Sequence, residues 1–267
     1  MNLLIGLIFS FIIAFPALKK QSLSKSGFVA ALILGSLIYY SSGILGFSTM
    51  IIFFISSSFI SKKNKQEEKY NKILDKGSCR DYIQVLANGS VALLFSLVFK
   101  ITNNNIFLMG VVTSFAAANA DTWASEIGGQ SKDIPRYIFS KKPVSRGLSG
   151  GVTKLGFIAS LLGSLLIACW FTILSSIING FTLNSVLNLI IISISGFIGA
   201  LIDSILGETV QVKYISWKDE DLITERSEED SKKNKIVSGI SFFDNNLVNF
   251  VSVLISSLIG ICLAILN

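Results

Sequence analysis

Two short stretches of the sequence carry a pair of carboxylates at the same spacing, with a hydroxyl side chain directly after the first acid. The first stretch runs from Asp121 to Glu126 (DTWASE), and the second runs from Asp203 to Glu208 (DSILGE). Both fit the pattern D-(S/T)-x-x-(S/G)-E, and both close a long apolar block. A carboxylate near a membrane boundary is expensive to place and is usually functional. Carboxylates combined with substrate phosphates are what Mg²⁺ prefers as ligands.

The repeated pattern is what an internal duplication of the chain would leave. On a regular α-helix, positions five apart differ by about 140°, so Asp121 and Glu126 share a target only if the helix loosens near Glu126 or its side chain reaches round. We predict that Asp121, Glu126 and Asp203 are catalytic, and that these three acids and Glu208 hold Mg²⁺. The alternative is that the acids are interfacial side chains that extend to water.

The segment from residue 139 to residue 154 (FSKKPVSRGLSGGVTK) mixes cations, hydroxyls and glycines directly before an apolar block. Glycines let the backbone approach an anion, a helix N-terminus offers free N–H groups, and Lys and Arg supply charge. The spacing is not that of a Walker A loop, and an ordinary basic loop is the alternative. The residues that we expect to bind substrate or nucleotide phosphates here are Ser140, Lys141, Lys142, Arg146, Gly150 and Gly151.

Three amide side chains lie in or beside apolar blocks and are further candidates for this binding role: Asn88, Asn119 and Asn246. Gln84 and Asn88 are four positions apart and would share one face of a helix. Amides inside membranes often only link helices, which is the alternative interpretation.

The composition is that of a membrane protein. Hydrophobic residues make up 51% of the 267 residues and charged residues 15%, against roughly 25% charged in a soluble domain. Long blocks of Leu, Ile, Val and Phe favour helices over a β-barrel, whose strands would alternate. The absence of histidine removes the commonest zinc ligand and the commonest general base near neutral pH. The three widely spaced cysteines indicate neither a disulfide framework nor a metal site.

About eight apolar blocks are long enough to cross about 30 Å of hydrocarbon as helices. They cover residues 2–18, 27–42, 45–61, 83–99, 105–123, 152–177, 186–206 and 246–266. The second and third blocks are separated only by residues 41–43, so they form either a hairpin or a partly re-entrant segment. We therefore predict an all-α, polytopic transmembrane bundle of about eight helices, within a range of seven to nine, as a single domain over residues 1–267.

Lysine and arginine gather in every second loop of this scheme. All 23 basic residues except Lys100 lie in or beside the segments 19–26, 62–82, 124–151 and 207–245. The positive-inside rule makes these loops cytoplasmic and places both termini outside. The net charge of +6 then reflects orientation and attraction to lipid headgroups, and we expect no nucleic-acid partner. The stretch 218–235, dense in both signs, is expected to be a solvated excursion.

With these residues in view, the chain resembles the integral membrane family called domain of unknown function 92, which includes transmembrane protein 19. The match covers nearly the whole chain. Its most specific parts are RDYIQVLANG (80–89), NADTWASEIG (119–128), residues 140–151 and DSILGETVQ (203–211). The family includes the plant phytyl-phosphate kinase of tocopherol synthesis. The resemblance therefore implies phosphorylation of a prenyl monophosphate to a diphosphate by a nucleoside triphosphate.

A looser similarity is to membrane enzymes that use CTP, namely phosphatidate cytidylyltransferase, dolichol kinase and phytol kinase. Their pattern D-x-x-A-x-x-x-G followed by S-x-K-x-x-x-x-G is matched here by Asp121, Ala124, Gly128, Ser140, Lys142 and Gly147. The chain departs from the pattern at Arg146, where those enzymes often carry an acid. A shared catalytic role at that position is therefore not implied.

The resulting hypothesis is a membrane enzyme that transfers a phosphoryl group from CTP or another nucleoside triphosphate to a lipid monophosphate such as a prenyl phosphate. Its expected cofactor is Mg²⁺, and its expected partners are membrane lipids and the lipid phosphate. Two alternatives remain open: a cytidylyltransferase that forms a CDP-linked lipid, and a transporter without catalysis. A kinase releases CDP or ADP, whereas a cytidylyltransferase releases pyrophosphate. A transporter would carry broken helices and charges near the bilayer centre.

Overall fold

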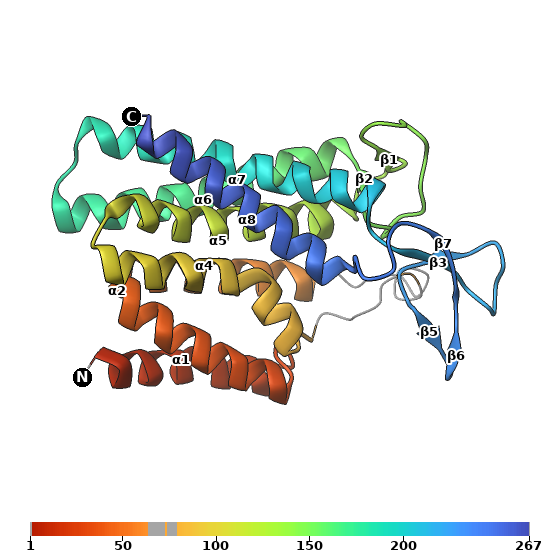
Figure 1. Cartoon of the computed structure of the whole chain (residues 1–267), viewed down its shortest axis with the longest axis horizontal. Coiled ribbons are helices and arrows are strands. Elements are labelled where there is room, and N and C mark those ends of the chain that lie inside the picture. Colours follow the sequence, from red (N-terminus) through yellow and green to blue (C-terminus); the bar gives the residue numbers. More distant parts are fainter. Residues whose placement is uncertain (1, 64–72, 74–78, 267) are drawn as a thin grey trace.

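The computed structural model of the chain describes residues 2–63, 73 and 79–266. Helices dominate these residues and lie alongside one another in one bundle (Figure 1). In chain order they are α1 (Asn2–Lys19), α2 (Lys25–Lys63), α4 (Tyr82–Thr102), α5 (Asn105–Gly128), α6 (Lys154–Asn179), α7 (Leu183–Thr209) and α8 (Asn245–Ile265). All of these described helices except α5 are long and apolar enough to cross a membrane. The predicted polytopic helical bundle is confirmed.

The element α2 reverses direction at Gly43 and so supplies two antiparallel segments. Gly43 has φ +63° and ψ −156°, a backbone conformation that is essentially restricted to glycine. The rings of Tyr39 and Phe47 lie 5.4 Å apart, and Phe9 of α1 packs against both. In a straight helix, positions eight apart would be separated by about 12 Å. The hairpin is therefore the correct alternative, and counting both of its arms brings the described helical segments to the predicted number.

Helix α5 lies at the centre of the bundle, where it contacts α2, α4, α6, α7 and α8. Its residues from Leu108 to Ala120 are all buried. Many of them are Gly, Ala or Ser, and such small side chains let neighbouring helices approach closely. A helix surrounded by protein needs close packing more than a lipid-compatible surface, which explains why α5 is the least apolar of the described helices.

Short antiparallel strands cover one end of the bundle (Figure 1). The strand pairs are β1 (Arg136–Tyr137) with β2 (Gly151–Val152), β3 (Lys213–Ile215) with both β4 (Ile223–Thr224) and β7 (Lys235–Ser238), and β5 (Glu228–Glu229) with β6 (Lys232–Lys233). Most residues of 218–235 are exposed, as the prediction of a solvated excursion requires, yet the stretch folds into the short strands β4, β5 and β6. Thr224 and Glu225 are buried there, because the carbonyl oxygen of Ile73 accepts hydrogen bonds from the Thr224 hydroxyl at 3.0 Å and the Glu225 N–H at 2.9 Å.

Both chain termini lie at the end of the bundle opposite the strands (Figure 1). The basic segments 124–151 and 207–245 lie together at the strand end, whereas most of the predicted loop 62–82 falls outside the described residues. This is the arrangement expected from the alternation of basic loops. The assignment of the strand end to the cytoplasm stays a prediction from the positive-inside rule.

Cysteine labelling tests this orientation. In a background in which Cys79, Cys169 and Cys262 are replaced by serine, we expect a membrane-impermeant maleimide to label Phe181→Cys in intact cells. The variant Lys132→Cys should react only after the membrane is permeabilised, because residues 132 and 181 lie at opposite ends of the bundle and are both exposed. The reverse pattern would place the strand end outside.

Candidate functional site

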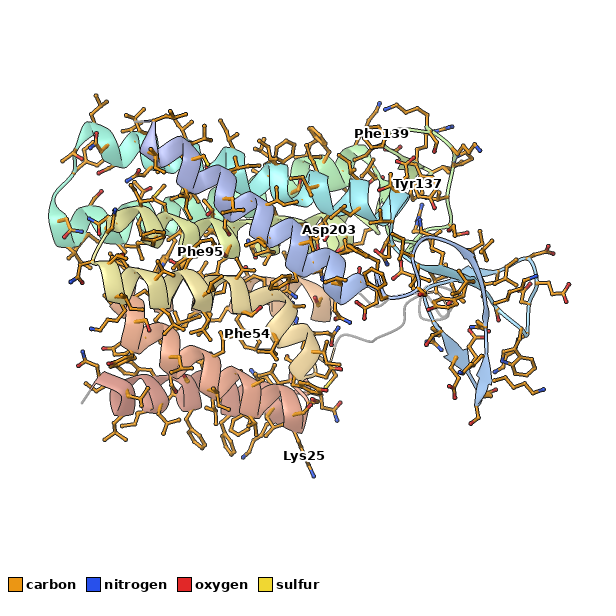
Figure 2. All side chains as sticks on the ribbon, viewed as in Figure 1. Lys25, Phe54, Phe95, Tyr137, Phe139 and Asp203 are labelled. Atoms are coloured by element: carbon orange, nitrogen blue, oxygen red, sulfur yellow. The ribbon has the colours of Figure 1, made fainter. Side chains whose placement is uncertain are left out.

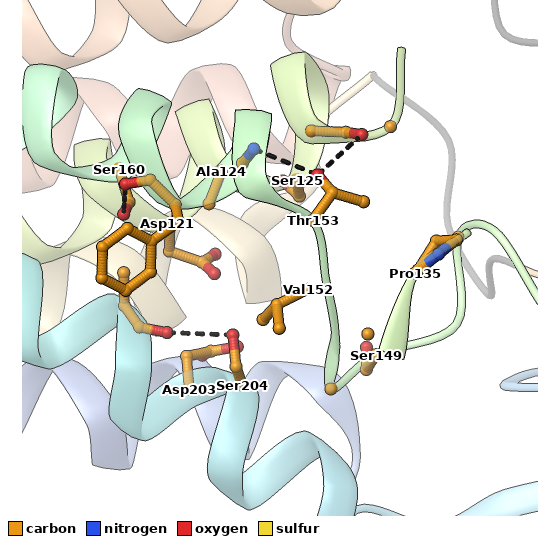
Figure 3. Close-up of a pocket in the computed structure, with 18 of the residues that line it drawn as sticks. Asp121, Ala124, Ser125, Pro135, Ser149, Val152, Thr153, Ser160, Asp203 and Ser204 are labelled. Atoms are coloured by element: carbon orange, nitrogen blue, oxygen red, sulfur yellow. Dashed lines mark hydrogen bonds between the residues drawn. The ribbon is translucent and has the colours of Figure 1, made fainter. Parts of the chain in front are cut away.

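Asp121 of α5 and Asp203 of α7 face each other at the strand end of the bundle (Figure 3). Their carboxyl groups lie within hydrogen-bonding reach of each other, and the Ser252 hydroxyl of α8 donates to Asp203 Oδ2 at 3.0 Å. Only 7% of Asp203 is exposed. Two like charges held this close with little water repel strongly. The pair therefore needs a shared proton or a bound cation.

Small residues one turn before each aspartate set the distance between α5 and α7. A Cβ atom added at Gly199 would lie 2.6 Å from Ala117 Cβ and 2.8 Å from Ser256 Cβ. Ala117 precedes Asp121 by four positions and Gly199 precedes Asp203 by four, so each small residue shares a helix face with its aspartate. The residues four positions before the first aspartate of each motif therefore contact each other, and this contact places the two aspartates opposite each other.

A pocket of about 210 Å³ opens beside the aspartate pair, which is roughly seven times the volume of a water molecule in the liquid. Its walls come from α5, α6, α7, the glycine-rich loop before α6 and the first residue of α8. The residues proposed from the sequence that line it are Asp121, Glu126, Arg146, Gly150, Gly151 and Asp203. Three carboxylates, one cation and two loop glycines thus surround one cavity, and their chemical roles stay predictions.

The glycine-rich loop lies directly against the C-terminal end of α7. Gly150 has φ +87°, and a Cβ atom added there would meet the backbone nitrogen of Glu208 at 2.5 Å. A Cβ atom added at Gly207 would lie 2.7 Å from the backbone nitrogen of Gly150. Glycine is required at both positions because any side chain would separate the two backbones. The loop therefore contacts α7 one turn beyond Asp203, which fixes it beside the aspartate pair.

Glu208 binds the first part of the same loop. Its Oε2 atom accepts a hydrogen bond from the Phe139 N–H and its Oε1 atom accepts one from the Ser140 N–H, each at 2.9 Å. Lys141 and Lys142 follow on the exposed surface. The predicted metal ligand Glu208 and the predicted phosphate ligands Ser140, Lys141 and Lys142 therefore lie outside the lining of the described pocket.

The three predicted amides also lie outside this lining. Asn119 is fully buried, donates to the Gly163 carbonyl at 2.7 Å and accepts from the Ser56 hydroxyl at 2.8 Å. It links α5 to α6 and α2, which is the structural role common for amides in membranes.

The other two amides make local hydrogen bonds. Asn88 donates to the carbonyl of Gln84 at 3.0 Å. Asn246 donates to the side chain of Asp244 at 3.1 Å.

Two residues not proposed from the sequence belong to the site or support it. Asn245 lines the pocket, and its Oδ1 atom accepts from the Ser149 hydroxyl at 3.3 Å. Glu225 accepts from the Ser149 N–H at 2.7 Å and so holds the glycine-rich loop from the strand side. The signal for Asn245 was its position directly after Asp244, the N-cap of α8. The signal for Glu225 was the β-branched pair before it (Ile223–Thr224) within the charged run.

A buried lysine ties the strand layer to this loop. Lys213 is 3% exposed, and its ammonium group donates to the Tyr137 hydroxyl at 2.9 Å. Burial lowers the pKa of Lys213, while the nearby carboxylates of Glu225 and Glu208 oppose that shift. Burial, followed by the same two carboxylates, raises the pKa of Tyr137. The cation thus joins β3 to β1 and is attracted by the two acids that hold the loop backbone.

Within the described residues, no group of three or more His, Cys, Asp or Glu side chains is placed to hold a metal ion. Asp121 and Asp203 instead form a set of two carboxylates. Mg²⁺ is usually bound by one or two carboxylates, with water and substrate phosphates completing its ligands. The residues present therefore fit Mg²⁺ that arrives with a phosphate-bearing substrate better than a site closed by protein ligands.

The chain matches the family model described as integral membrane protein DUF92 over residues 8–257. It belongs to this family. Protein PGR of Arabidopsis thaliana is 30% identical over 96% of this chain and 94% of its own length. The uncharacterized membrane protein MJ0933 of Methanocaldococcus jannaschii is 29% identical over 80% of this chain and 85% of its own. Protein VTE6, chloroplastic, of Arabidopsis thaliana is 29% identical over 59% of this chain and 49% of its own.

No solved structure matches the chain. The family membership and the six apolar spans together establish a multi-pass integral membrane protein. The resemblance inferred from the four sequence motifs is thereby confirmed.

The contact between α5 and α7 gives one prediction about stability. Gly199→Leu should lower the free energy of unfolding by about 1–3 kcal/mol, because the new side chain must displace Ala117 or Ser256 from a packed contact. Denaturation of the purified protein in detergent measures the change. Ile194→Leu is the matched control, since Ile194 lies on the same helix and is 47% exposed. Equal stability of the two variants would contradict the close contact.

The role of Glu208 gives a second prediction. Glu208→Ala removes the acceptor of two backbone N–H groups, so the loop at 139–142 should open more often and trypsin should cleave after Lys141 roughly tenfold faster. Glu208→Gln keeps one acceptor oxygen and should fall between wild type and Glu208→Ala. Glu220→Ala, at an exposed acid of the strand layer, is the control. Identical cleavage rates in all variants would show that Glu208 does not hold the loop.

Proposed function

We propose that this protein is a membrane-embedded kinase that transfers a phosphoryl group from a nucleoside triphosphate to a prenyl monophosphate or a similar lipid phosphate. The observation that carries the proposal is the facing pair of Asp121 and Asp203, which shares a pocket with Arg146 and the glycine-rich loop. Membership of the DUF92 family supports the proposal, because the family that the sequence resembles includes the plant phytyl-phosphate kinase.

Asp121 and Asp203 would hold Mg²⁺, with Glu126 as a further carboxylate in the lining of the same pocket. When bound, Mg²⁺ would neutralise charge on the triphosphate and on the transferred group. The sequence has no histidine, which is no obstacle to this chemistry. Phosphoryl transfer depends mainly on positioning and charge stabilisation, and a phosphate acceptor is already an anion.

Arg146 and the loop that follows it are placed to bind the triphosphate. The Arg146 guanidinium lines the pocket and donates to the Asp133 carbonyl at 3.2 Å, which leaves most of its five N–H donors for phosphate oxygens. The N-terminal end of α6 opens on the same pocket through Thr153 and Gly156, and helix N-termini favour anions. These groups would hold the β- and γ-phosphates while an oxygen of the lipid phosphate attacks the γ-phosphorus. The bond to the β-phosphate then breaks and a nucleoside diphosphate leaves.

The location of the pocket favours this reaction over transport. The carboxylates, Arg146 and the glycine-rich loop all lie at the strand end of the bundle (Figures 1 and 3), where a nucleotide arrives from water and a lipid phosphate reaches the interface from the bilayer. A transporter would need polar groups along a path through the membrane. The basic loops predict that this end faces the cytoplasm, which contains the nucleoside triphosphates.

The test uses purified protein with Mg²⁺, labelled CTP or ATP, and geranylgeranyl or phytyl monophosphate. We expect a lipid diphosphate together with CDP or ADP. Asp121→Asn and Asp203→Asn should each lower turnover by at least roughly 100-fold, because each removes charge stabilisation from the transferred group. Asp133→Asn is the control: it changes an exposed acid in the segment between α5 and α6 and should leave turnover unchanged.

Two outcomes would contradict the proposal. Release of pyrophosphate with a CDP-linked lipid would identify a cytidylyltransferase. Wild-type turnover in both aspartate variants would exclude the carboxylate pair as the centre of the reaction.

A further inference from the structure

A second pocket lies between α1, α2 and α4 and is lined mainly by apolar side chains. It measures about 70 Å³, and Figure 2 labels one of its lining residues, Phe54 of α2. Further aromatic walls come from Phe47, Phe53 and Phe115. The polar side chains in its lining are Ser10, Arg80, Gln84 and Asn88. Three of these polar side chains come from the start of α4 or the residues just before it.

Arg80 brings a cation into this apolar lining. Its guanidinium carbon lies 5.6 Å from the centre of the Phe53 ring, and Glu126 attracts it electrostatically. Within the described part of the chain, no side chain or carbonyl accepts a hydrogen bond from the guanidinium. An arginine has five N–H donors in a planar fork that matches phosphate oxygens. The described residues therefore leave the hydrogen-bond donors of the guanidinium open to a ligand, while Glu126 compensates part of its charge.

The backbone presents Arg80 in a fixed position. Its N–H donates to the Ser22 carbonyl at 3.1 Å, and its carbonyl accepts from the Ser24 N–H at 3.0 Å. A side chain at Gly27 would overlap the Arg80 carbonyl, so the start of α2 lies in direct contact with it. Asp81 then caps α4. The cation is thus preorganised, which lowers the entropy lost when a ligand binds.

The amides beside Arg80 add donors of the same kind. Gln84 Oε1 accepts from the Asp81 N–H at 3.1 Å, which leaves the amide nitrogen of Gln84 as a donor. Arg80, Gln84 and Asn88 follow each other at intervals of four, so the two amides lie on the face of α4 that continues from Arg80. A polar strip thus begins at the strand end of the bundle and runs into an apolar pocket.

Arg80 also connects this pocket to the aspartate site. Glu126, whose carboxylate attracts the guanidinium, lines the first pocket together with Asp121. An anion held by Arg80 would therefore lie within electrostatic range of a carboxylate of the aspartate site. A cation with amide donors at one end and aromatic and aliphatic walls at the other matches an amphiphile with an anionic head. The apolar walls would not stabilise a water-soluble anion, and the guanidinium charge would not stabilise a neutral lipid.

We propose that this pocket is the acceptor site, in which Arg80 binds the phosphate of the lipid monophosphate and the apolar walls hold the part of the tail next to it. The inference rests on the proposed function and adds the position of the acceptor. The pocket is small, so the remainder of the tail would continue among the lipid chains. Arg80 and Arg146 then have separate tasks, since the first binds the acceptor and the second binds the donor.

Binding without nucleotide tests the acceptor site. The probe is geranylgeranyl monophosphate in detergent micelles, with geranylgeraniol as the same tail without the phosphate. We expect Arg80→Gln to weaken binding of the monophosphate roughly 10- to 100-fold, as the loss of charge-assisted hydrogen bonds implies, and to leave binding of the alcohol unchanged. Lys25→Gln is the matched control, because it removes one positive charge from an exposed site at the same end of the bundle (Figure 2).

Several results would overturn the inference. The inference fails if Arg80→Gln and Lys25→Gln bind the monophosphate with equal affinity. It also fails if Arg80→Gln loses as much affinity for the alcohol as for the monophosphate. Arg80→Lys should recover part of the affinity, because it restores the charge without the fork. If Arg80→Gln does not fold, Ala31→Leu decides the question, since Ala31 lines the pocket and the larger side chain should weaken binding of both lipids.

Kinetics separate this inference from the proposed function. If the protein is a kinase, Arg80→Gln should raise KM for the lipid monophosphate and leave KM for the nucleotide unchanged. A raised KM for the nucleotide alone would refute the acceptor site and leave the kinase intact. If no nucleotide is turned over, the proposed function fails, and the binding measurements still decide whether Arg80 recognises a lipid phosphate.

Discussion

The structure depends on two carboxylates that are held face to face where little water reaches them. Asp121 and Asp203 lie on different helices, and their separation is set by Ala117 and Gly199 one turn away. Because like charges in such surroundings repel by several kcal/mol, the pair requires a shared proton when no cation is bound. A pair that can exchange its shared proton for a cation is suited to the proposed binding of a metal-bound phosphate.

The remaining parts of the site are fixed relative to this pair. Gly150 and Gly207 bring the glycine-rich loop against α7, and Glu208 and Glu225 hold its backbone N–H groups from two sides. Lys213 is attracted by both acids and compensates part of their charge. The acids of the second motif therefore divide their tasks, since the first faces the pocket and the second holds the loop. Equal spacing in the sequence does not imply equal roles.

The sequence was sufficient for the features that depend on local pattern. Apolar length predicted the helical segments, the glycine at position 43 allowed the hairpin, and the repeated motif indicated that Asp121 and Asp203 belong together. It was insufficient where the partner is distant in the chain. Glu225 is buried because strand β4 binds the carbonyl of Ile73, and no periodicity reports such a contact. Asn119 was predicted to be a ligand because it is an amide in an apolar block, yet its side chain is hydrogen-bonded to the Gly163 carbonyl and the Ser56 hydroxyl.

The electrostatic attraction between Arg80 and Glu126 links the two pockets of the bundle. Helices α1, α2 and α4, together with Phe115 of α5, surround the apolar pocket, whereas α5, α6, α7 and the first residue of α8 surround the carboxylates. A phosphoryl transfer between a water-soluble donor and a lipid acceptor needs two environments that meet within a few ångströms, since reacting atoms must approach to about 3–3.5 Å. An arginine on the apolar side and a glutamate on the polar side attract each other across this boundary. An arriving lipid phosphate would therefore compete with Glu126 for the same cation.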